Sequence, residues 1–174
     1  MSSTEENLQT AFAGESQANR RYLFFADKAE KEGHPQIARL FRAAAEAETV
    51  HARNHFAAMD GVGSTRDNLV AGAMGEDYEF TRMYPPFIEQ AESEGNKRAQ
   101  TSFNYANEVE QIHHKYFEEA IKAFDVGQQL KDEPYFVCPV CGNVVDAITS
   151  SQCPICGTDT KKFKAIMPRT GVAG

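Results

Sequence analysis

Two copies of a Glu-x-x-His motif are the residues in this sequence best suited to bind metal. Glu48 is followed by His51, and Glu110 is followed by His113. Side chains three residues apart leave the same face of a helix, so each motif presents a carboxylate and an imidazole together. Apolar residues around each motif recur with the period of a core-facing helix, which places the motifs on the buried face. A buried carboxylate must be neutralised, paired or bound to metal, and no Lys or Arg lies on these faces.

Two further acids occupy core positions on the helices that we expect to precede the motifs. Glu15 lies on a predicted helix that ends at Gly33, and Glu76 on one that ends at Gly95. Each glycine is close to the midpoint between its acid and the following motif, so in two antiparallel hairpins the acids meet at one height. Two Glu and two Glu-x-x-His at one level form the ligand set of dinuclear carboxylate sites in four-helix bundles. Oxygen-rich ligation with one imidazole per metal favours iron or manganese over zinc or copper.

The two predicted hairpins are an internal repeat. Residues 29–33 recur as residues 91–95, and the second helix of each hairpin recurs at the same offset. A repeat of this length indicates a duplicated structural unit. We expect four helices, with a kink at Pro85-Pro86 because proline removes a backbone donor and crowds the preceding turn. Their bounds are predicted as residues 3–33, 35–60, 64–95 and 96–127.

Glu79 is an acid that the repeat does not explain, because the matching position on the first helix is Ala18 or Asn19. It is either a surface acid or a fifth carboxylate beside the metal pair. Tyr22 and Tyr84 lie near the acids along their helices, and either could hydrogen-bond a ligand carboxylate, although buried tyrosines are common near any core. The remaining histidines have no comparable support. We expect His55 in the core or beside a ligand, and His34 and His114 on the surface.

All four cysteines lie near the C-terminus in two matched C-P-x-C-G segments. These are Cys138 with Cys141, and Cys153 with Cys156. Four thiolates in a tetrahedral array bind zinc or a single iron. The spacing alone favours zinc, whereas a redox site in the same chain favours iron. The segment is too small for a large apolar core, so the metal should hold it folded.

Composition excludes several classes of function. The chain has 174 residues and a formal net charge of −7, which argues against a nucleic-acid partner. Its first residues are polar and acidic, unlike a signal peptide, and no apolar run is long enough for a membrane helix. We therefore expect a cytoplasmic protein of two domains, residues 1–130 and 131–174, with a loosely held tail from Arg169.

Over nearly its whole length the sequence resembles the rubrerythrin family, whose first-helix motif is similar to residues 12–18 here. The resemblance implies a mainly α protein: a ferritin-like di-iron four-helix bundle followed by a small rubredoxin-like domain. One iron would take Glu15, Glu48 and either His51 or Glu79. The other would take Glu76, Glu110 and His113, with Glu48 and Glu110 bridging.

Tyr22 and Tyr84 would match the family's tyrosines beside the site, and the rubredoxin-like iron would take Cys138, Cys141, Cys153 and Cys156. Asn143 stands where such modules often carry an aromatic residue.

The family resemblance also implies a function. It predicts a peroxidase that reduces hydrogen peroxide to water, with electrons that an external reductase or carrier supplies through the cysteine-bound iron. The family implies a homodimer in which the cysteine module of one subunit serves the bundle of the other. The alternatives are a ferroxidase or iron-storage protein, and a zinc-ribbon adaptor without a redox role.

A ferritin-like bundle sets one further expectation, because its second and third helices are parallel and joined by a long crossover. Residues 61–67 span at most about 25 Å when fully extended. This length predicts either a nearly straight crossover or the exchange of hairpins between two subunits.

Overall fold

The chain divides after Gly63 into two compact units. The structure, a computed structural model, describes residues 3–167; unit 1 comprises the residues up to Gly63 and unit 2 those from Ser64. The expectation of a loose tail from Arg169 lies outside the described residues, and the domain boundary at residues 130/131 stays a prediction. Among the described residues, no helix is long and apolar enough to cross a membrane.

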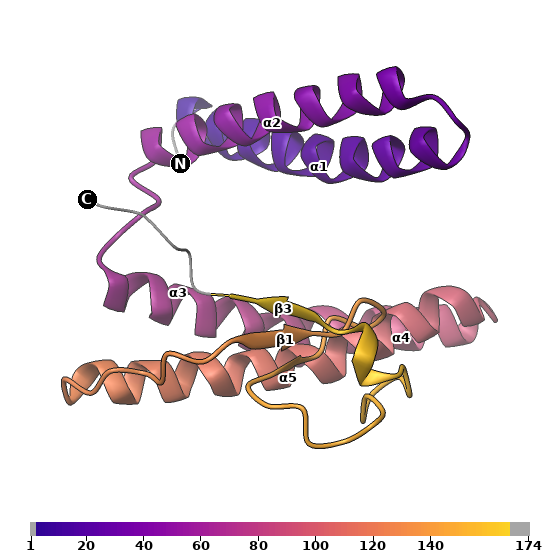
Figure 1. Ribbon diagram of the computed structural model, residues 1–174. Coiled ribbons are helices and arrows are strands. Elements are labelled where there is room, and N and C mark those ends of the chain that lie inside the picture. The colour runs from indigo at the N-terminus through magenta and orange to yellow at the C-terminus, as the bar shows by residue number, and fades with distance from the viewer. Residues whose placement is uncertain (1–2, 168–174) are drawn as a thin grey trace. The chain divides into compact units, whose positions relative to one another are not determined.

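Unit 1 is an antiparallel helical hairpin of α1 (Ser3–Lys31) and α2 (Pro35–Ala58) (Figure 1). Gly33 allows the tight turn between them, because its φ of +82° is a conformation that residues with a Cβ rarely adopt. Pro35 starts α2, where a missing N–H costs nothing. The buried residues of this hairpin are all alanines, Ala26, Ala29, Ala38 and Ala45, as far as the described part of unit 1 is concerned. Small side chains let the two helices approach, but they bury little apolar area.

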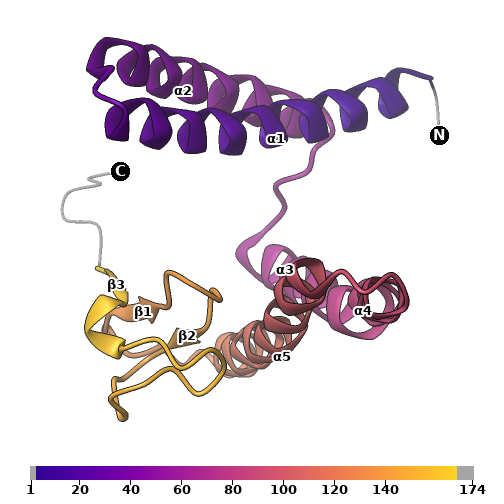
Figure 2. The same ribbon diagram turned by 90° about the vertical axis from the view of Figure 1, so that its right-hand side faces the viewer.

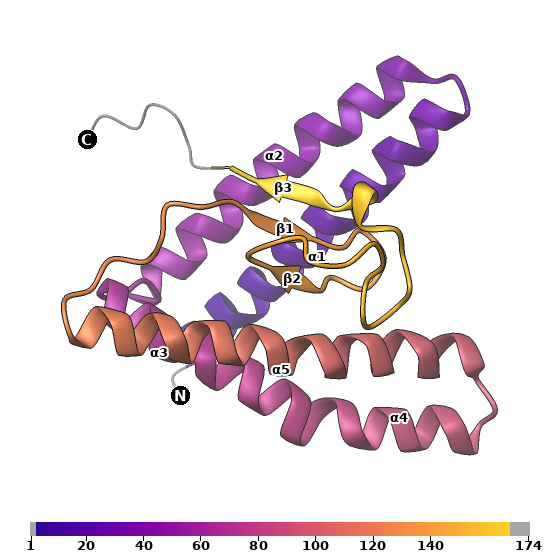
Figure 3. The ribbon, with the colours of Figure 1, turned by 60° about the horizontal axis from the view of Figure 1, so that its bottom comes forward.

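Unit 2 begins with a second helical hairpin, whose first arm is interrupted. It consists of α3 (Thr65–Tyr78), a π-helical turn η1 (Glu79–Met83), α4 (Tyr84–Ser93) and α5 (Lys97–Asp125). α3 and α4 run alongside α5 (Figure 3). Ser64 and Asp67 form a capping box at the start of α3, and the Asn96 side chain caps α5. The predicted helices are therefore confirmed, except that the third is divided.

The π-helical turn lies immediately before the two prolines. The Tyr84 N–H donates to the carbonyl of Glu79, one residue farther back than in an α-helix. Pro85 and Pro86 cannot donate to the preceding turn, so the helix widens there instead of simply bending at the prolines. The sequence predicted a kink at this place, and the structure shows that one extra residue is accommodated in it.

This extra residue is visible in the spacing of the repeat. Glu76 follows Glu15 by 61 residues, whereas Tyr84 follows Tyr22 by 62. The repeat therefore gains one residue between the acid and the tyrosine, where the π-helical turn lies. π-helical turns commonly arise at such positions and often mark functional sites. After the turn the two hairpins match again, because each contains a cluster of three rings with centroids 5.5–6.4 Å apart, Tyr22–Phe25–Phe41 in unit 1 and Tyr84–Phe87–Phe103 in unit 2.

The C-terminal part of unit 2 is a small antiparallel sheet of order β2-β1-β3, made of β1 (Tyr135–Val137), β2 (Val144–Val145) and β3 (Lys164–Ile166). A 3-10 turn, η2 (Thr160–Lys162), precedes β3. Figures 2 and 3 show this sheet on the side of α5 away from α4. The Tyr116 hydroxyl of α5 accepts a hydrogen bond from the Asp146 N–H at 3.2 Å, and its ring contacts Tyr135 edge to face. We call residues 131–167 the cysteine module.

Candidate metal centres

Unit 1 brings together one acid of α1 and the Glu-x-x-His motif of α2. Ligand atoms of Glu15, Glu48 and His51 all lie within 4.8 Å of one another. His51 Nδ1 is 2.8 Å from Glu48 Oε2, and the His51 side chain is 53% exposed. We call these three residues half-site 1. Two carboxylates and an imidazole that converge on one point are a suitable donor set for iron.

Unit 2 repeats this arrangement with Glu76 of α3 and the motif of α5. Ligand atoms of Glu76, Glu110 and His113 lie within 4.8 Å of one another, and we call them half-site 2. His113 Nδ1 is 2.7 Å from Glu110 Oε2 and 3.7 Å from Glu76 Oε2. All three side chains are at most 25% exposed. The predicted pairing of each lone Glu with the following motif is therefore present in both hairpins.

The acids of half-site 2 are held close enough to disturb each other's ionisation. Burial, followed by the hydrogen bond and the charge of Glu110, raises the pKa of Glu76 to about 7. The pKa of His113 is raised as well, chiefly by its hydrogen bond to Glu110 and against the effect of burial. Two carboxylates that share a site resist simultaneous ionisation. A divalent or trivalent cation would remove this conflict, which supports the fit of a metal to these residues.

Glu79 and Tyr84 flank half-site 2 at the two ends of the π-helical turn. Burial and then the charge of Glu110 raise the pKa of Glu79, while His113 opposes this effect. The pKa of Tyr84 is raised by burial and then by Glu79, Glu110 and Glu76. The charges of half-site 2 therefore act on both side chains. Glu79 is nevertheless not one of the three residues whose ligand atoms converge there. Tyr22, the matching tyrosine of unit 1, packs its ring against Phe25 and Phe41.

The four cysteines form a second kind of site within the cysteine module. Sγ atoms are 3.5 Å apart between Cys138 and Cys156, and 3.6 Å apart between Cys141 and Cys153. A tetrahedral metal with bonds of about 2.3 Å to sulfur needs sulfur atoms about 3.8 Å apart, so the site fits one metal ion.

The two cysteine segments form matching turns around this site. The Gly142 N–H donates to the carbonyl of Cys138 at 3.0 Å, and the Gly157 N–H to that of Cys153 at 2.9 Å. Both glycines have positive φ, +83° and +73°, which explains why glycine ends each segment.

Asn143 is the fully buried polar residue of the module, with 0% exposure. Its side-chain N–H group is directed at Cys153 Sγ, with Nδ2 3.7 Å from the sulfur, and its Oδ1 has no hydrogen-bond partner. The sequence identified Asn143 only as a departure from an aromatic residue. The structure shows that its side chain lies against a sulfur of the four-cysteine site.

The cysteine module lies directly over half-site 2 of the same chain. The backbone of Gly142 raises the pKa of His113, so it faces the imidazole. A Cβ built on Gly142 would lie 3.9 Å from a methyl group of Val109, one turn before His113 on α5. His113, whose buried Nε2 has no hydrogen-bond partner, thus faces the residue that follows Cys141. No spacing in the sequence predicts this contact, because it depends on how the module docks on α5.

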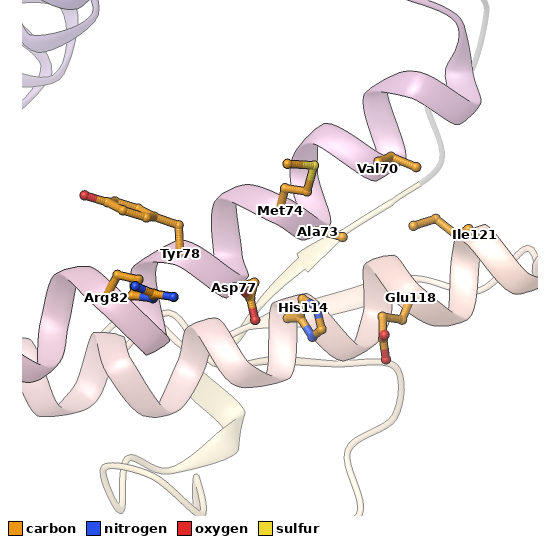
Figure 4. A pocket seen from close by; sticks show the side chains of 9 residues that line it. All are labelled: Val70, Ala73, Met74, Asp77, Tyr78, Arg82, His114, Glu118 and Ile121. Carbon is orange, nitrogen blue, oxygen red and sulfur yellow. The ribbon is translucent and has the colours of Figure 1, made fainter.

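The remaining histidines do not join either half-site. His114 lines a hollow of about 550 Å³ between α3 and α5, together with Met74, Tyr78 and Glu118 (Figure 4). Its ring contacts Phe80 edge to face at 5.6 Å. The sequence predicted His114 on the surface, but the structure places it half-buried. Adjacent residues of a helix point about 100° apart, so His114 lies in the hollow beside Phe80 while His113 faces Glu76 and Glu110.

Helical hairpins with two carboxylate–imidazole ligand sets, followed by a four-cysteine module, define a ferritin-like di-iron protein with a rubredoxin-like domain. The family model described as Rubrerythrin matches residues 6–121. Rubrerythrin-2 of Clostridium acetobutylicum is 36% identical, with 93% of this chain and 96% of that protein covered. Rubrerythrin of Porphyromonas gingivalis is 38% identical, with coverage of 94% and 90%. The solved structure of the fully reduced, all-ferrous state of nigerythrin has a TM-score of 0.57 and 35% identity, covering 95% of this chain and 88% of that one.

The chain therefore belongs to the rubrerythrin family. It is an oxidoreductase with a di-iron carboxylate site and a rubredoxin-like iron site, and its donor sets fit both. The predicted mainly α fold with a small C-terminal metal domain is confirmed.

Proposed function

We propose that this protein is a peroxidase that reduces hydrogen peroxide to two waters, using two electrons and two protons. The observation that carries the proposal is the position of the cysteine module, whose Gly142 faces His113 of half-site 2. A redox-active iron bound by four cysteines is useful only where it can pass electrons to another centre. The contact between the residue after Cys141 and a proposed iron ligand supplies the short route that such transfer needs.

The proposal assigns the ligands as follows. Half-sites 1 and 2 would together hold two irons, with Glu48 and Glu110 each available as a ligand to both. Their position supports this assignment, because each is hydrogen-bonded to its own motif histidine and lies beside a lone acid of the neighbouring helix. Iron held there would supply the electrons and the Lewis acidity that peroxide reduction needs. The four cysteines bind the rubredoxin-like iron.

The protein groups beside half-site 2 are suited to handling the protons of this reaction. Glu76 is itself an assigned ligand, so its raised pKa of about 7 describes the metal-free site and marks the conflict of charges that bound iron would relieve. Tyr84 has a raised pKa, so its hydroxyl stays protonated and can donate a hydrogen bond to a nearby carboxylate. Its surroundings of Glu79, Glu110 and Glu76 support this role.

Glu79 is proposed as an alternative ligand to His51 for one of the two irons. Ferric iron prefers a carboxylate and ferrous iron tolerates an imidazole better, so the preferred ligand should depend on oxidation state. The support from this structure is that Glu79 feels the charges of Glu110 and His113, and that it starts a π-helical turn, a feature frequent at functional sites.

The proposal includes a homodimer, an external electron donor and a cytoplasmic location. The paired C-x-x-C segments support the last point, because thiolate ligands persist in a reducing compartment. The net charge of −7 supports neither a nucleic acid nor an anionic membrane surface as partner.

A rapid-mixing experiment tests the proposed activity. Protein loaded with iron and fully reduced without oxygen is mixed with hydrogen peroxide, and the red colour of the oxidised cysteine-bound iron is followed. We expect the colour to return at a rate that rises with peroxide concentration, and a Cys141→Ala variant to lose continuous turnover. An iron-storage protein would take up added ferrous iron in excess of three ions per chain instead. A colourless protein with zinc at the cysteines would contradict the relay.

A further inference from the structure

The charges of this chain are distributed unevenly between its helices and the cysteine module. Residues 1–130 contain 13 Lys and Arg against 21 Asp and Glu, whereas three lysines of the module, Lys161, Lys162 and Lys164, lie close together in the sequence. All three are exposed, and within residues 3–167 none of them forms an ion pair. We call these three lysines the basic patch. It is a local positive surface on a protein whose helical part is acidic.

The basic patch lies at the edge of the sheet that is remote from α5. The strand order is β2-β1-β3, and β2 is the strand in contact with α5, so β3 forms the opposite edge (Figures 2 and 3). The 3-10 turn η2 carries Lys161 and Lys162, and β3, which follows it, carries Lys164. A protein that binds to this edge would therefore reach the cysteine module without meeting α5.

The same edge of the module is tied closely to the cysteine site. Lys164 pairs with Val137, the residue before Cys138. The α-carbons of Lys164 and Cys138 are therefore at most about 9 Å apart. The Thr158 hydroxyl, three residues before the basic patch, lies 3.1 Å from Cys156 Sγ. A donor held at the basic patch would thus be only a short distance from two of the four sulfur atoms.

The cysteines leave different routes open on the two sides of the module. Cys138 and Cys153 are buried, whereas Cys141 and Cys156 are partly exposed. Cys141 lines a hollow together with Tyr105 of α5, on the side where the module faces half-site 2. Cys156 is instead hydrogen-bonded within the segment that leads to η2. Electrons that leave the module past Cys141 can therefore enter it from the edge formed by β3.

Exposed apolar side chains accompany the basic patch. Ile166 of β3 is 47% exposed and Met167, the next residue, is 64% exposed. Protein–protein interfaces combine an apolar centre with a polar or charged rim. Two apolar side chains beside three lysines form a small surface of this kind, which suits a partner that presents carboxylates around an apolar spot.

We propose that the basic patch, together with Ile166 and Met167, is the docking surface for an acidic one-electron carrier protein that reduces the cysteine-bound iron. One electron passes from the reduced carrier to the ferric ion; no bond forms or breaks and no proton is transferred. Opposite charges accelerate the encounter and orient the two proteins, while the acidic helices repel the same carrier. The inference rests on the proposed function, in which an external donor supplies the cysteine site.

Reduction by a carrier of known charge tests the docking surface. Full-length, iron-loaded, oxidised protein is mixed without oxygen with reduced plant-type ferredoxin, a strongly reducing acidic carrier, and the loss of the red colour is followed. The test variant combines Lys161→Glu, Lys162→Glu and Lys164→Glu. At low ionic strength we expect its second-order rate to be lower than that of the wild type by about tenfold or more. The difference should shrink in high salt, where surface charges are screened.

A matched control reverses three exposed lysines of the helices, Lys28→Glu, Lys31→Glu and Lys122→Glu, and so changes the net charge equally. At about 0.1 M salt its rate should stay within about twofold of the wild type, because distant charges are screened. Reduced methyl viologen, a small cation, should reduce neither variant more slowly than the wild type. Should the test variant fail to fold, Lys161→Gln with Lys162→Gln leaves β3 unchanged and should give a smaller decrease in the same direction.

Binding without electron transfer provides a second measurement. Oxidised ferredoxin is titrated into the oxidised protein, so that no electron can move, and the affinity is measured by calorimetry at low salt. We expect the test variant to bind about tenfold more weakly than the wild type, or not at all. The control variant should bind much better than the test variant.

Equal rates and affinities in the test and control variants would overturn the docking surface. Lysines on an edge strand can also serve only to prevent pairing with other chains. In that case the test variant would self-associate and still accept electrons at the wild-type rate, which would equally overturn the inference. The proposed function is tested separately, by mixing fully reduced protein with hydrogen peroxide in the absence of any carrier. Failure to reoxidise there would refute the peroxidase and leave the result on docking unchanged.

Discussion

The reduction potential of the cysteine-bound iron should depend on Asn143. This side chain is fully buried, and its Nδ2 lies 3.7 Å from Cys153 Sγ. Asn143→Leu keeps a side chain of similar size and removes the N–H donor. It also removes the unpartnered Oδ1, so the fold should lose little stability.

The expected size of the effect follows from the contact. A hydrogen bond to sulfur stabilises the ferrous site, which carries one more negative charge, more than the ferric site. Because 3.7 Å is a long contact, we assign it the lower part of the usual range, about 0.5–1 kcal/mol. For a one-electron couple, in which a tenfold change in the equilibrium constant is 59 mV, this energy is about 20–45 mV. The potential of Asn143→Leu should therefore be lower than that of the wild type by this amount.

A redox titration followed by the visible absorption of the ferric site measures this difference. Asn143→Asp is the matched comparison, because it keeps the shape but replaces the donor with a negative charge, and its potential should fall further than that of Asn143→Leu. Unchanged visible absorption in the oxidised state would show that four-sulfur coordination is intact in both variants. A potential for Asn143→Leu equal to or above that of the wild type would refute the contribution of this hydrogen bond.

Three further predictions concern the helical part of unit 2. Glu79→Ala should keep both irons of the bundle, as iron analysis would show, and should reduce peroxide several-fold more slowly in steady-state kinetics. Unchanged turnover would show that Glu79 has no role in the reaction. In the metal-free protein the pKa of Glu76 is higher in the folded state than in the unfolded chain. The folded protein therefore binds more protons than the unfolded chain between about pH 4.5 and 7. The free energy of unfolding should consequently fall as pH rises through this range. Urea titrations should show this fall in the wild type and a smaller one in Glu76→Gln. Tyr116→Phe removes the hydroxyl that accepts from Asp146, and should slow electron transfer from the cysteine site without changing the iron content; equal transfer rates would contradict this.

The sequence predicted the helices and the two half-sites because both depend on local spacing. Glu48 and His51 share a helical face whatever the rest of the chain does, and the glycine between each lone acid and its motif fixes the height at which they meet. The caps that the structure shows at Ser64 and Asn96 are also local features, since each involves residues within one turn.

The features that escaped prediction depend on contacts between distant residues or on a change of helix type. The position of the cysteine module results from contacts such as that of Tyr116 with Asp146, which are 30 residues apart. The burial of Asn143 depends on the fold of the module, which brings it against Cys153, 10 residues farther along the chain. The π-helical turn could have been inferred from the change in repeat spacing between Glu76 and Tyr84, a signal that lies in the sequence but requires the two hairpins to be aligned residue by residue.

The π-helical turn has a consequence for the history of this molecule. A single residue added to an ordinary helix would rotate everything after it by about 100° and would turn the Tyr–Phe–Phe cluster away from the core. Because the widened turn absorbs the addition, the second copy of a duplicated hairpin could acquire Glu79 while Tyr84 and Phe87 kept the positions of their counterparts. The two hairpins therefore differ in length by one residue, in the interval that contains Glu79. That single residue lets them carry different sets of acids while their aromatic clusters stay matched.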